Sequence, residues 1–88
     1  MQIDREKDAL VVVDLQHDFL PGGALAVAGG DAVIAPIAGL VPAFATVVAT
    51  QDWHPPGYVS FASAHPGARP LGTAALPQGP QELWPDHC

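Results

Sequence analysis

The sequence predicts an α/β fold that begins as an incomplete, doubly wound parallel sheet, with a first βαβ unit followed by a loop region suited to a metal site. Three observations predict it. Residues 9–13 and 45–50 are short β-branched apolar runs, residues 32–44 between them suit a helix, and the rest is rich in proline. Alternation of strand, helix and strand is typical of parallel α/β sheets.

The first strand is expected at residues 9–13, Ala-Leu-Val-Val-Val. A continuous β-branched run is typical of a strand that is buried on both faces of a parallel sheet. Asp14 follows it directly, and residues 16–30 contain Pro-Gly-Gly and Gly-Gly, so a long turn-rich loop is expected next. Loops at strand ends often carry binding and catalytic side chains.

The crossover helix is expected at residues 32–44. Asp31 stands where it can cap the helix, and Ile34, Ile37 and Val41 have approximately helical spacing. Pro36 falls in the first turns, where proline costs least.

The second strand is expected at residues 45–50, Ala-Thr-Val-Val-Ala-Thr. Beyond Thr50, prolines recur so often that neither a long helix nor a strand ladder is expected. We therefore expect this part of the chain to be a loop region that forms a site. Because a parallel sheet usually needs about four or more strands to cover itself, we expect the domain to be incomplete.

Composition excludes several classes of partner. The 88 residues carry a formal charge of -6, so the basic patch that binds nucleic acid or anionic lipid is not expected. The charged first residues do not suit a signal peptide, and no apolar stretch reaches the ~20 residues of a membrane span. The single cysteine, Cys88, cannot form an internal disulfide. We expect a cytoplasmic protein without nucleic-acid or membrane partners.

A metal site is indicated just beyond the second strand. In extended geometry Asp52 and His54 point to the same side, and a carboxylate with an imidazole suits Zn²⁺, Mn²⁺ or Fe²⁺. His87, in a proline-stiffened segment, is a candidate third ligand. The residues alone leave the alternative that these are ordinary loop side chains. His65 and His17 are weaker candidates, because one lies in a turn and the other beside the acidic end of the first strand.

Asp14 is the candidate general base. A carboxylate held at an apolar strand end can accept a proton from a reacting group, although an aspartate that merely forms a turn is an equal alternative. Phe19 and Trp84 are candidates for the flat apolar walls of a pocket for an aromatic ring. Ordinary core packing is the alternative for both.

Four segments together resemble the nicotinamidase/pyrazinamidase family of isochorismatase-like cysteine hydrolases. They occur in matching order and span nearly the whole chain: residues 13–25 (VDLQHDFLPGGAL), 50–55 (TQDWHP), 59–62 (VSFA) and 84–88 (WPDHC). The Asp-x-His pair combined with the later Trp-Pro-x-His-Cys motif separates nicotinamidases from metal-free relatives in the same group.

The resemblance implies a hydrolase that converts nicotinamide, or its analogue pyrazinamide, to the acid and ammonia in NAD salvage and pyridine nucleotide biosynthesis. A cysteine thiolate attacks the carboxamide, ammonia leaves, and water cleaves the thioester. Asp14 matches the catalytic base, and Phe19 and Trp84 match the residues that sandwich the substrate ring.

The resemblance also implies one divalent metal ion, Zn, Mn or Fe. Asp52, His54 and His87 match its ligands, and water and the ring nitrogen of the substrate take the open positions. Some members have a further histidine where this chain has Tyr58, so three protein ligands are expected here.

In the family, the catalytic lysine and the nucleophilic cysteine follow the Trp-Pro-x-His-Cys motif. Residues 1–88 are therefore expected to be the N-terminal portion of a single isochorismatase-like hydrolase domain, truncated before both residues and inactive alone. A homo-oligomer is compatible with the full-length form. Cys88 does not match the nucleophile and is interpreted as a small buried hydrophobic residue. The alternative, a nucleophile beside His87, is disfavoured because adjacent residues in an extended segment point to opposite faces.

Two other interpretations remain. The chain could be a non-catalytic remnant that binds metal, or an incomplete domain that folds only with a complementary chain. A different isochorismatase-like amide hydrolase without metal conflicts with the three metal-ligand matches. A lysine and a cysteine encoded downstream would favour the enzyme, and a genuine stop codon would favour the remnant.

Overall fold

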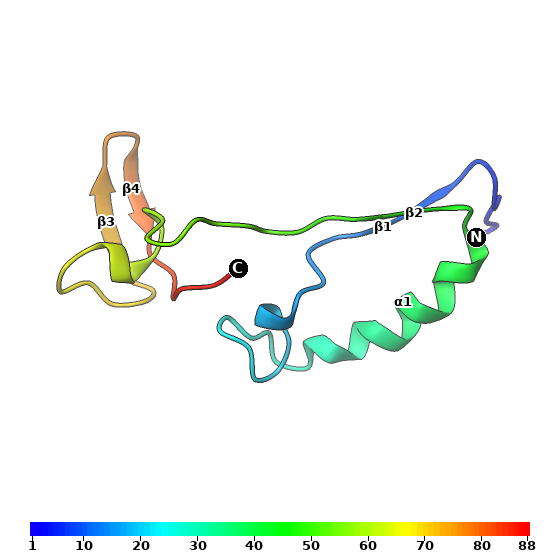
Figure 1. Ribbon diagram of the computed structural model, residues 1–88, viewed down its shortest axis with the longest axis horizontal. Helices are drawn as coiled ribbons and strands as arrows, with labels where there is room; N and C mark the ends of the chain where they lie inside the picture. Colours follow the sequence, from blue (N-terminus) through cyan, green and yellow to red (C-terminus); the bar gives the residue numbers. More distant parts are fainter. The chain divides into compact units, whose positions relative to one another are not determined.

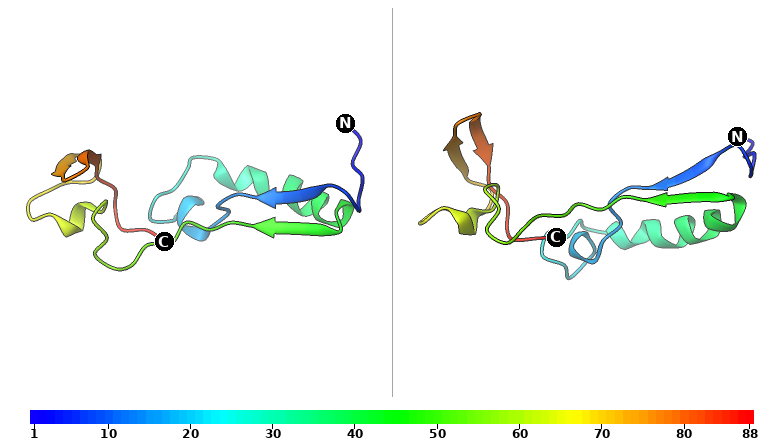
Figure 2. Two further views of the ribbon diagram at one scale, coloured as in Figure 1. Left: turned by 90° about the horizontal axis from the view of Figure 1, so that it is seen from above. Right: turned by 45° about the horizontal axis from the view of Figure 1, so that its top comes forward.

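The two β-branched runs form a pair of parallel strands, as the sequence predicts. β1 spans Ala9–Val12 and β2 spans Thr46–Ala49, with Ala9 opposite Thr46 and Val12 opposite Ala49. The computed structural model describes residues 1–88, and both strands belong to the first of its two units, Met1–Asp52. In Figure 2 the two arrows lie side by side and point the same way.

A helical segment connects the two strands. Its central part is α1, Ile34–Leu40, with 3-10 turns at Gly30–Val33 before it and Val41–Ala43 after it. Figure 1 shows the whole segment between the first loop and β2. The helix predicted for residues 32–44 is thus present, and it begins two residues earlier.

The predicted cap is wrong. Asp31 lies inside the first 3-10 turn, and the position before that turn is occupied by Gly29 in the left-handed conformation, with φ of 69°. Glycine enters that conformation without a side-chain clash, so the turn starts there. A carboxylate in the first turn still interacts favourably with the N-terminal end of the helical dipole.

The expectation that the first strand is buried on both faces is also wrong, because Ala9 and Val11 are exposed while Leu10 and Val12 are half-buried. No residue of β2 is even half-buried, and Val47 and Val48 are 42% and 46% exposed. Two strands and one short helix do not provide enough apolar surface to cover both faces of a sheet. The β-branched composition is typical of a buried strand, but the rest of this chain does not cover the strand faces.

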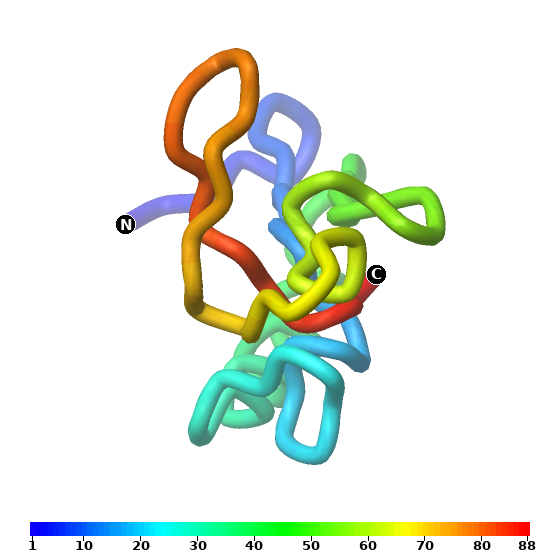
Figure 3. The backbone as a smooth tube through the Cα atoms, turned by 90° about the vertical axis from the view of Figure 1, so that its left-hand side faces the viewer, coloured from blue at the N-terminus to red at the C-terminus, as the bar shows by residue number.

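The second unit, Trp53–Cys88, contains an antiparallel hairpin that the sequence does not predict. β3 spans Thr73–Leu76 and β4 spans Gly79–Glu82, with Leu76 opposite Gly79 next to the two-residue turn. Figure 3 shows this hairpin as a long orange loop of the tube. The expectation that no strand ladder forms beyond Thr50 is therefore wrong.

Pro80 is accommodated within β4 because of its register. Hydrogen-bonded and non-hydrogen-bonded positions alternate along an antiparallel pair, and Gly79 takes the position that closes the turn. Pro80, opposite Ala75, takes the next position, where the nitrogen of a residue faces the free edge. A missing N–H is tolerated at an edge.

The core of the second unit is small and surrounds the segment that follows β4. Leu83 is completely buried, and Phe61 and Ala62 are 3% and 4% exposed. The backbone N–H of Leu83 donates to Gly72, and the backbone N–H of Trp84 donates to Ser60, so this segment is held from both sides. The last residues of the chain therefore follow a segment that is buried at Leu83 and held by backbone hydrogen bonds.

No helix in the structure has the length and hydropathy of a membrane-spanning segment.

Candidate metal centre

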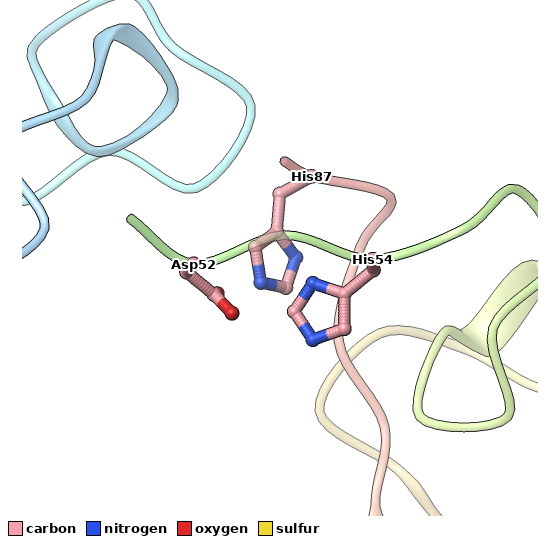
Figure 4. Close-up of side chains that lie close together, drawn as sticks. All are labelled: Asp52, His54 and His87. Atoms are coloured by element: carbon pink, nitrogen blue, oxygen red, sulfur yellow. The ribbon is translucent and has the colours of Figure 1, made fainter. Parts of the chain in front are cut away.

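Three side chains that lie close together in space form the candidate site: Asp52, His54 and His87. One ligand atom of each lies within 4.8 Å of the others, and all three residues are half-buried. Figure 4 shows the carboxylate and the two imidazole rings gathered at one place. Asp52 and His54 come from the segment that leaves β2, and His87 comes from the segment that follows the buried Leu83.

A hydrogen bond fixes the tautomer of His87. Its Nδ1 lies 2.8 Å from the carbonyl oxygen of Pro85, and because a carbonyl can only accept, Nδ1 carries the proton. The lone pair then lies on Nε2, the atom that a metal ion needs. This pattern, in which a backbone carbonyl orients a ligating histidine, is common at metal sites.

The buried Phe61 supports both imidazole rings. Its ring centroid lies 5.2 Å from that of His54 and 5.3 Å from that of His87, and the two imidazoles are 5.0 Å apart. The backbone N–H of His54 also donates to the carbonyl of Cys88 at 2.5 Å, which joins the two ligand-bearing segments. The rings are thus held by an apolar platform and a backbone hydrogen bond.

The donor set fits a borderline divalent cation. Two imidazole nitrogens and one carboxylate oxygen are typical ligands of Zn²⁺, Mn²⁺ and Fe²⁺. Donor atoms bound to one ion at about 2.0–2.2 Å lie at most roughly 4.4 Å apart. The observed limit of 4.8 Å is therefore within a few tenths of an ångström of a shared ion.

The two competing histidines lie outside this group. Nε2 of His65 is 2.7 Å from the carbonyl oxygen of Val59, to which it donates. His17 lines a separate open pocket with Asp18 and Asp31 in the first unit. The ring centroid of Tyr58, at the position where some members have a further histidine, lies 4.8 Å from that of His54.

Asp14 lies two residues beyond the end of β1, in a conformation that is uncommon for a residue with a side chain. Its φ is 53°, in the left-handed region that aspartate tolerates better than most residues. The hydroxyl of Thr50 donates to its carboxylate at 2.9 Å, and its own N–H donates to the same hydroxyl at 3.1 Å. The carboxylate is held in one orientation by these two bonds.

Asp14 and Phe19 line the same cavity of about 250 Å³. The other lining residues are mostly apolar, and they come from β1, the following loop and the helical segment: Leu10, Val11, Val12, Val13, Leu15, Gln16, Leu20, Val27, Gly30, Val33 and Ile37. The structure therefore brings the candidate base and one candidate ring-contacting residue together. Trp84 is half-buried in the second unit, where its backbone pairs with Phe61.

Two residues near the site were missed by sequence reasoning, Gln16 and Thr50. The Gln16 side chain forms two hydrogen bonds with the backbone of Asp52, and Thr50 holds Asp14 as described above. A signal was present, because Asp14 and Gln16 are two residues apart after β1, and Thr50 and Asp52 are two residues apart after β2. Only the register of the strands shows that these pairs meet.

Comparison with known proteins shows which proteins this chain is similar to. The chain is 58% identical to a nicotinamidase of Acinetobacter baylyi over 80 residues. The resemblance to the nicotinamidases is confirmed. Solved structures agree: a nicotinamidase/pyrazinamidase of Acinetobacter baumanii superimposes with a TM-score of 0.82 at 51% identity. The yeast nicotinamidase bound to the inhibitor nicotinaldehyde gives a TM-score of 0.76 at 36% identity.

The chain spans about two fifths of the nicotinamidases that it matches. The match covers 91% of this chain and 37% of the Acinetobacter baylyi protein. For the two solved nicotinamidase structures, the shares are 100% and 42%, and 91% and 43%. No family model matches the chain.

Proposed function

We propose that this chain is the metal-binding portion of a nicotinamidase, which in its full-length form hydrolyses nicotinamide to nicotinate and ammonia. The observation that carries the proposal is the convergence of Asp52, His54 and His87, in a chain that is 58% identical to a nicotinamidase. Pyrazinamide is the expected analogue substrate, because one related structure is described as a pyrazinamidase as well.

Each candidate site residue has a distinct task in the proposed reaction. Asp14, held by Thr50, accepts the proton of the nucleophilic thiol. The thiolate attacks the carboxamide carbon and forms a carbon–sulfur bond, and the C–N bond then breaks as the proton held by Asp14 passes to the leaving nitrogen, which departs as ammonia. Water cleaves the resulting thioester and restores the thiol. The thiol belongs to the part of the nicotinamidase length that this chain does not span.

Asp52, His54 and His87 would hold the metal ion, with Nε2 of His87 as its donor atom. A divalent ion held there supplies Lewis acidity to a bound water or to the ring nitrogen of the substrate. The chain's own contribution is to present three donors of the right type, of which the two imidazoles pack beside the ring of Phe61.

Phe19 and Trp84 are the proposed walls for the substrate ring. Phe19 lines the cavity that Asp14 also lines, so the ring and the base would share one pocket. The yeast relative in complex with nicotinaldehyde, a pyridine with a carbonyl substituent, supports a ligand of this class.

The larger fold is part of the same proposal. β1 and β2 would be two adjacent strands of a doubly wound sheet whose other strands, together with the catalytic lysine and cysteine, belong to the remaining length of the domain. The open valine faces of both strands and the 37% share of the matched nicotinamidase support this. A cytoplasmic role in NAD salvage, with homo-oligomerisation in the full-length form, follows from the same resemblance.

Metal analysis of the purified chain tests the proposal. We expect about one divalent ion per chain, and we expect His54→Ala or His87→Ala to remove most of it, because three protein ligands leave no redundancy. Bound metal is measured by elemental analysis after dialysis against a metal-buffered solution.

His65→Ala and His17→Ala are the matched controls, since both remove an imidazole outside the cluster. Metal stoichiometry should be unchanged in both. Equal loss of metal in the control variants, or full retention in His54→Ala and His87→Ala, would contradict the assignment.

A further inference from the structure

We propose that Gln16 is a positioning residue that aims the carboxylate of Asp52 at the metal centre. The proposal rests on the metal site proposed above and adds a residue from a different strand exit. Gln16 acts through the backbone of Asp52, which both polar groups of its side-chain amide bind.

The Gln16 side chain binds both polar groups of the Asp52 backbone. Its Nε2 donates to the Asp52 carbonyl at 3.0 Å, and its Oε1 accepts from the Asp52 N–H at 2.7 Å. Both bonds are partly buried. A primary amide that pairs with a peptide in this way replaces the neighbouring strand, so Asp52 is held in place where the sheet itself has ended.

These two bonds continue the strand pairing beyond the sheet. The last paired residues of β1 and β2 are Val12 and Ala49, and the N–H of Thr50 still donates to the carbonyl of Val12 at 2.9 Å. The next links are made by side chains, first between Asp14 and Thr50 and then between Gln16 and Asp52. Both pairs are separated by 36 residues in the sequence, so they are successive steps of one ladder.

The ladder determines where the Asp52 carboxylate lies. A side chain leaves the backbone in a direction fixed by the backbone around it, and metal–ligand distances tolerate only about 0.2 Å. Without Gln16, the peptide groups of Asp52 would bond to water and the residue could rotate. Outer partners of metal ligands typically contribute roughly 10–100-fold to metal affinity.

Cobalt titration of the whole chain tests the inference, because Co²⁺ accepts the same ligands and absorbs visible light. Gln16→Ala should weaken Co²⁺ binding by roughly 10–100-fold and change the shape of the absorption bands at saturation, because Asp52 no longer holds its place. The matched control is Gln81→Ala, which removes a glutamine amide that also donates to a backbone carbonyl, that of Glu82, in β4. Its cobalt affinity should stay within about twofold of the unchanged chain.

A second variant separates positioning from general loss of structure. Gln16→Glu retains an acceptor for the Asp52 N–H and loses the donor to the Asp52 carbonyl. In metal-free protein, hydrogen exchange of the Asp52 amide should be slow in Gln16→Glu and fast in Gln16→Ala, while the amides of β1 and β2 exchange alike in both. Circular dichroism reports whether each variant is folded.

The outcomes distinguish this inference from the proposed metal site. Absence of cobalt binding by the unchanged chain would overturn the metal site and this inference with it. Normal cobalt affinity and spectrum in Gln16→Ala, with cobalt still released in His87→Ala, would overturn the inference alone. Equal acceleration of exchange at Asp52 and throughout β1 would also overturn it, because Gln16 would then stabilise the whole unit.

Discussion

At the scale of single residues, Asp14 combines backbone strain with a fixed carboxylate. Its φ of 53° costs a non-glycine residue on the order of 1–3 kcal/mol when nothing compensates, and such strain often occurs at functional sites. The two bonds with Thr50 supply compensation. A residue that served only to turn the chain would be replaceable by glycine at lower cost, so its side chain is the feature that accounts for its presence.

Asp14→Asn in a full-length form should lower kcat by several orders of magnitude and leave metal content unchanged. Asparagine has the same size, tolerates the same φ and can still accept the Thr50 hydrogen bond, but it cannot take a proton from the thiol. Ammonia release and elemental analysis of the same preparation measure both quantities. Asp31→Asn is the control, and its kcat should stay within about twofold. Loss of metal in Asp14→Asn would show that Asp14 belongs to the metal site.

Residue spacing predicts part of the site and misses another part. The Asp52 and His54 pair follows from the alternation of side chains in an extended segment, which is a local property. Only the Trp-Pro-x-His-Cys motif indicates that His87 lies close to Asp52 and His54. The position of His87 depends on the packing of Leu83 and Phe61, which local spacing does not show. The partnership of Gln16 with Asp52 depends on strand register, which no local pattern encodes.

At the scale of elements, the β-branched composition of β1 and β2 outweighs everything else in the local sequence, and both strands form within one residue of the predicted bounds at each end. The β3–β4 hairpin is not predicted, because the repeated prolines argue against a strand ladder. One proline at a free edge leaves the remaining pairs intact, and Gly79, with φ of 124°, closes the turn.

Two glycines in the first unit should respond oppositely to alanine. Gly39, inside α1, has open space where a Cβ would lie, so Gly39→Ala should raise the free energy of unfolding by about 0.5–1 kcal/mol through helix propensity. A Cβ at Gly23 would meet the backbone carbonyls of His17 and Asp18, the latter at 2.5 Å. Gly23→Ala should therefore lower it by roughly 1–3 kcal/mol.

Urea denaturation followed by circular dichroism measures both glycine variants under the same conditions. The opposite signs make each variant the control for the other. A stabilising effect of Gly23→Ala would mean that the 3-10 turn at His17–Phe19 is not packed against Gly23 as described.

At the scale of the whole molecule, the 88-residue chain should release no ammonia from nicotinamide above a metal-only control. Asp14 has no matched thiol to deprotonate, and removal of a nucleophile typically costs many orders of magnitude in rate. Cys88→Ala should behave identically, because Cys88 does not match the nucleophile and the variant keeps the backbone carbonyl that accepts from the N–H of His54. Turnover that disappears in Cys88→Ala would overturn both the partial-enzyme proposal and the assignment of Cys88.

The position of Pro80 also affects which of the two units can pair its strand edges with strands of neighbouring molecules. An unpaired strand edge is a template for strands of neighbouring molecules unless something removes its donors. The outer edge of β4 lacks one N–H at Pro80, so extension of the hairpin into an intermolecular sheet is interrupted there. β1 and β2 contain no proline, and Val11, Val47 and Val48 in them are exposed. Strand addition from outside would therefore start at the first unit, and the negative charge of the chain is the main force that opposes it.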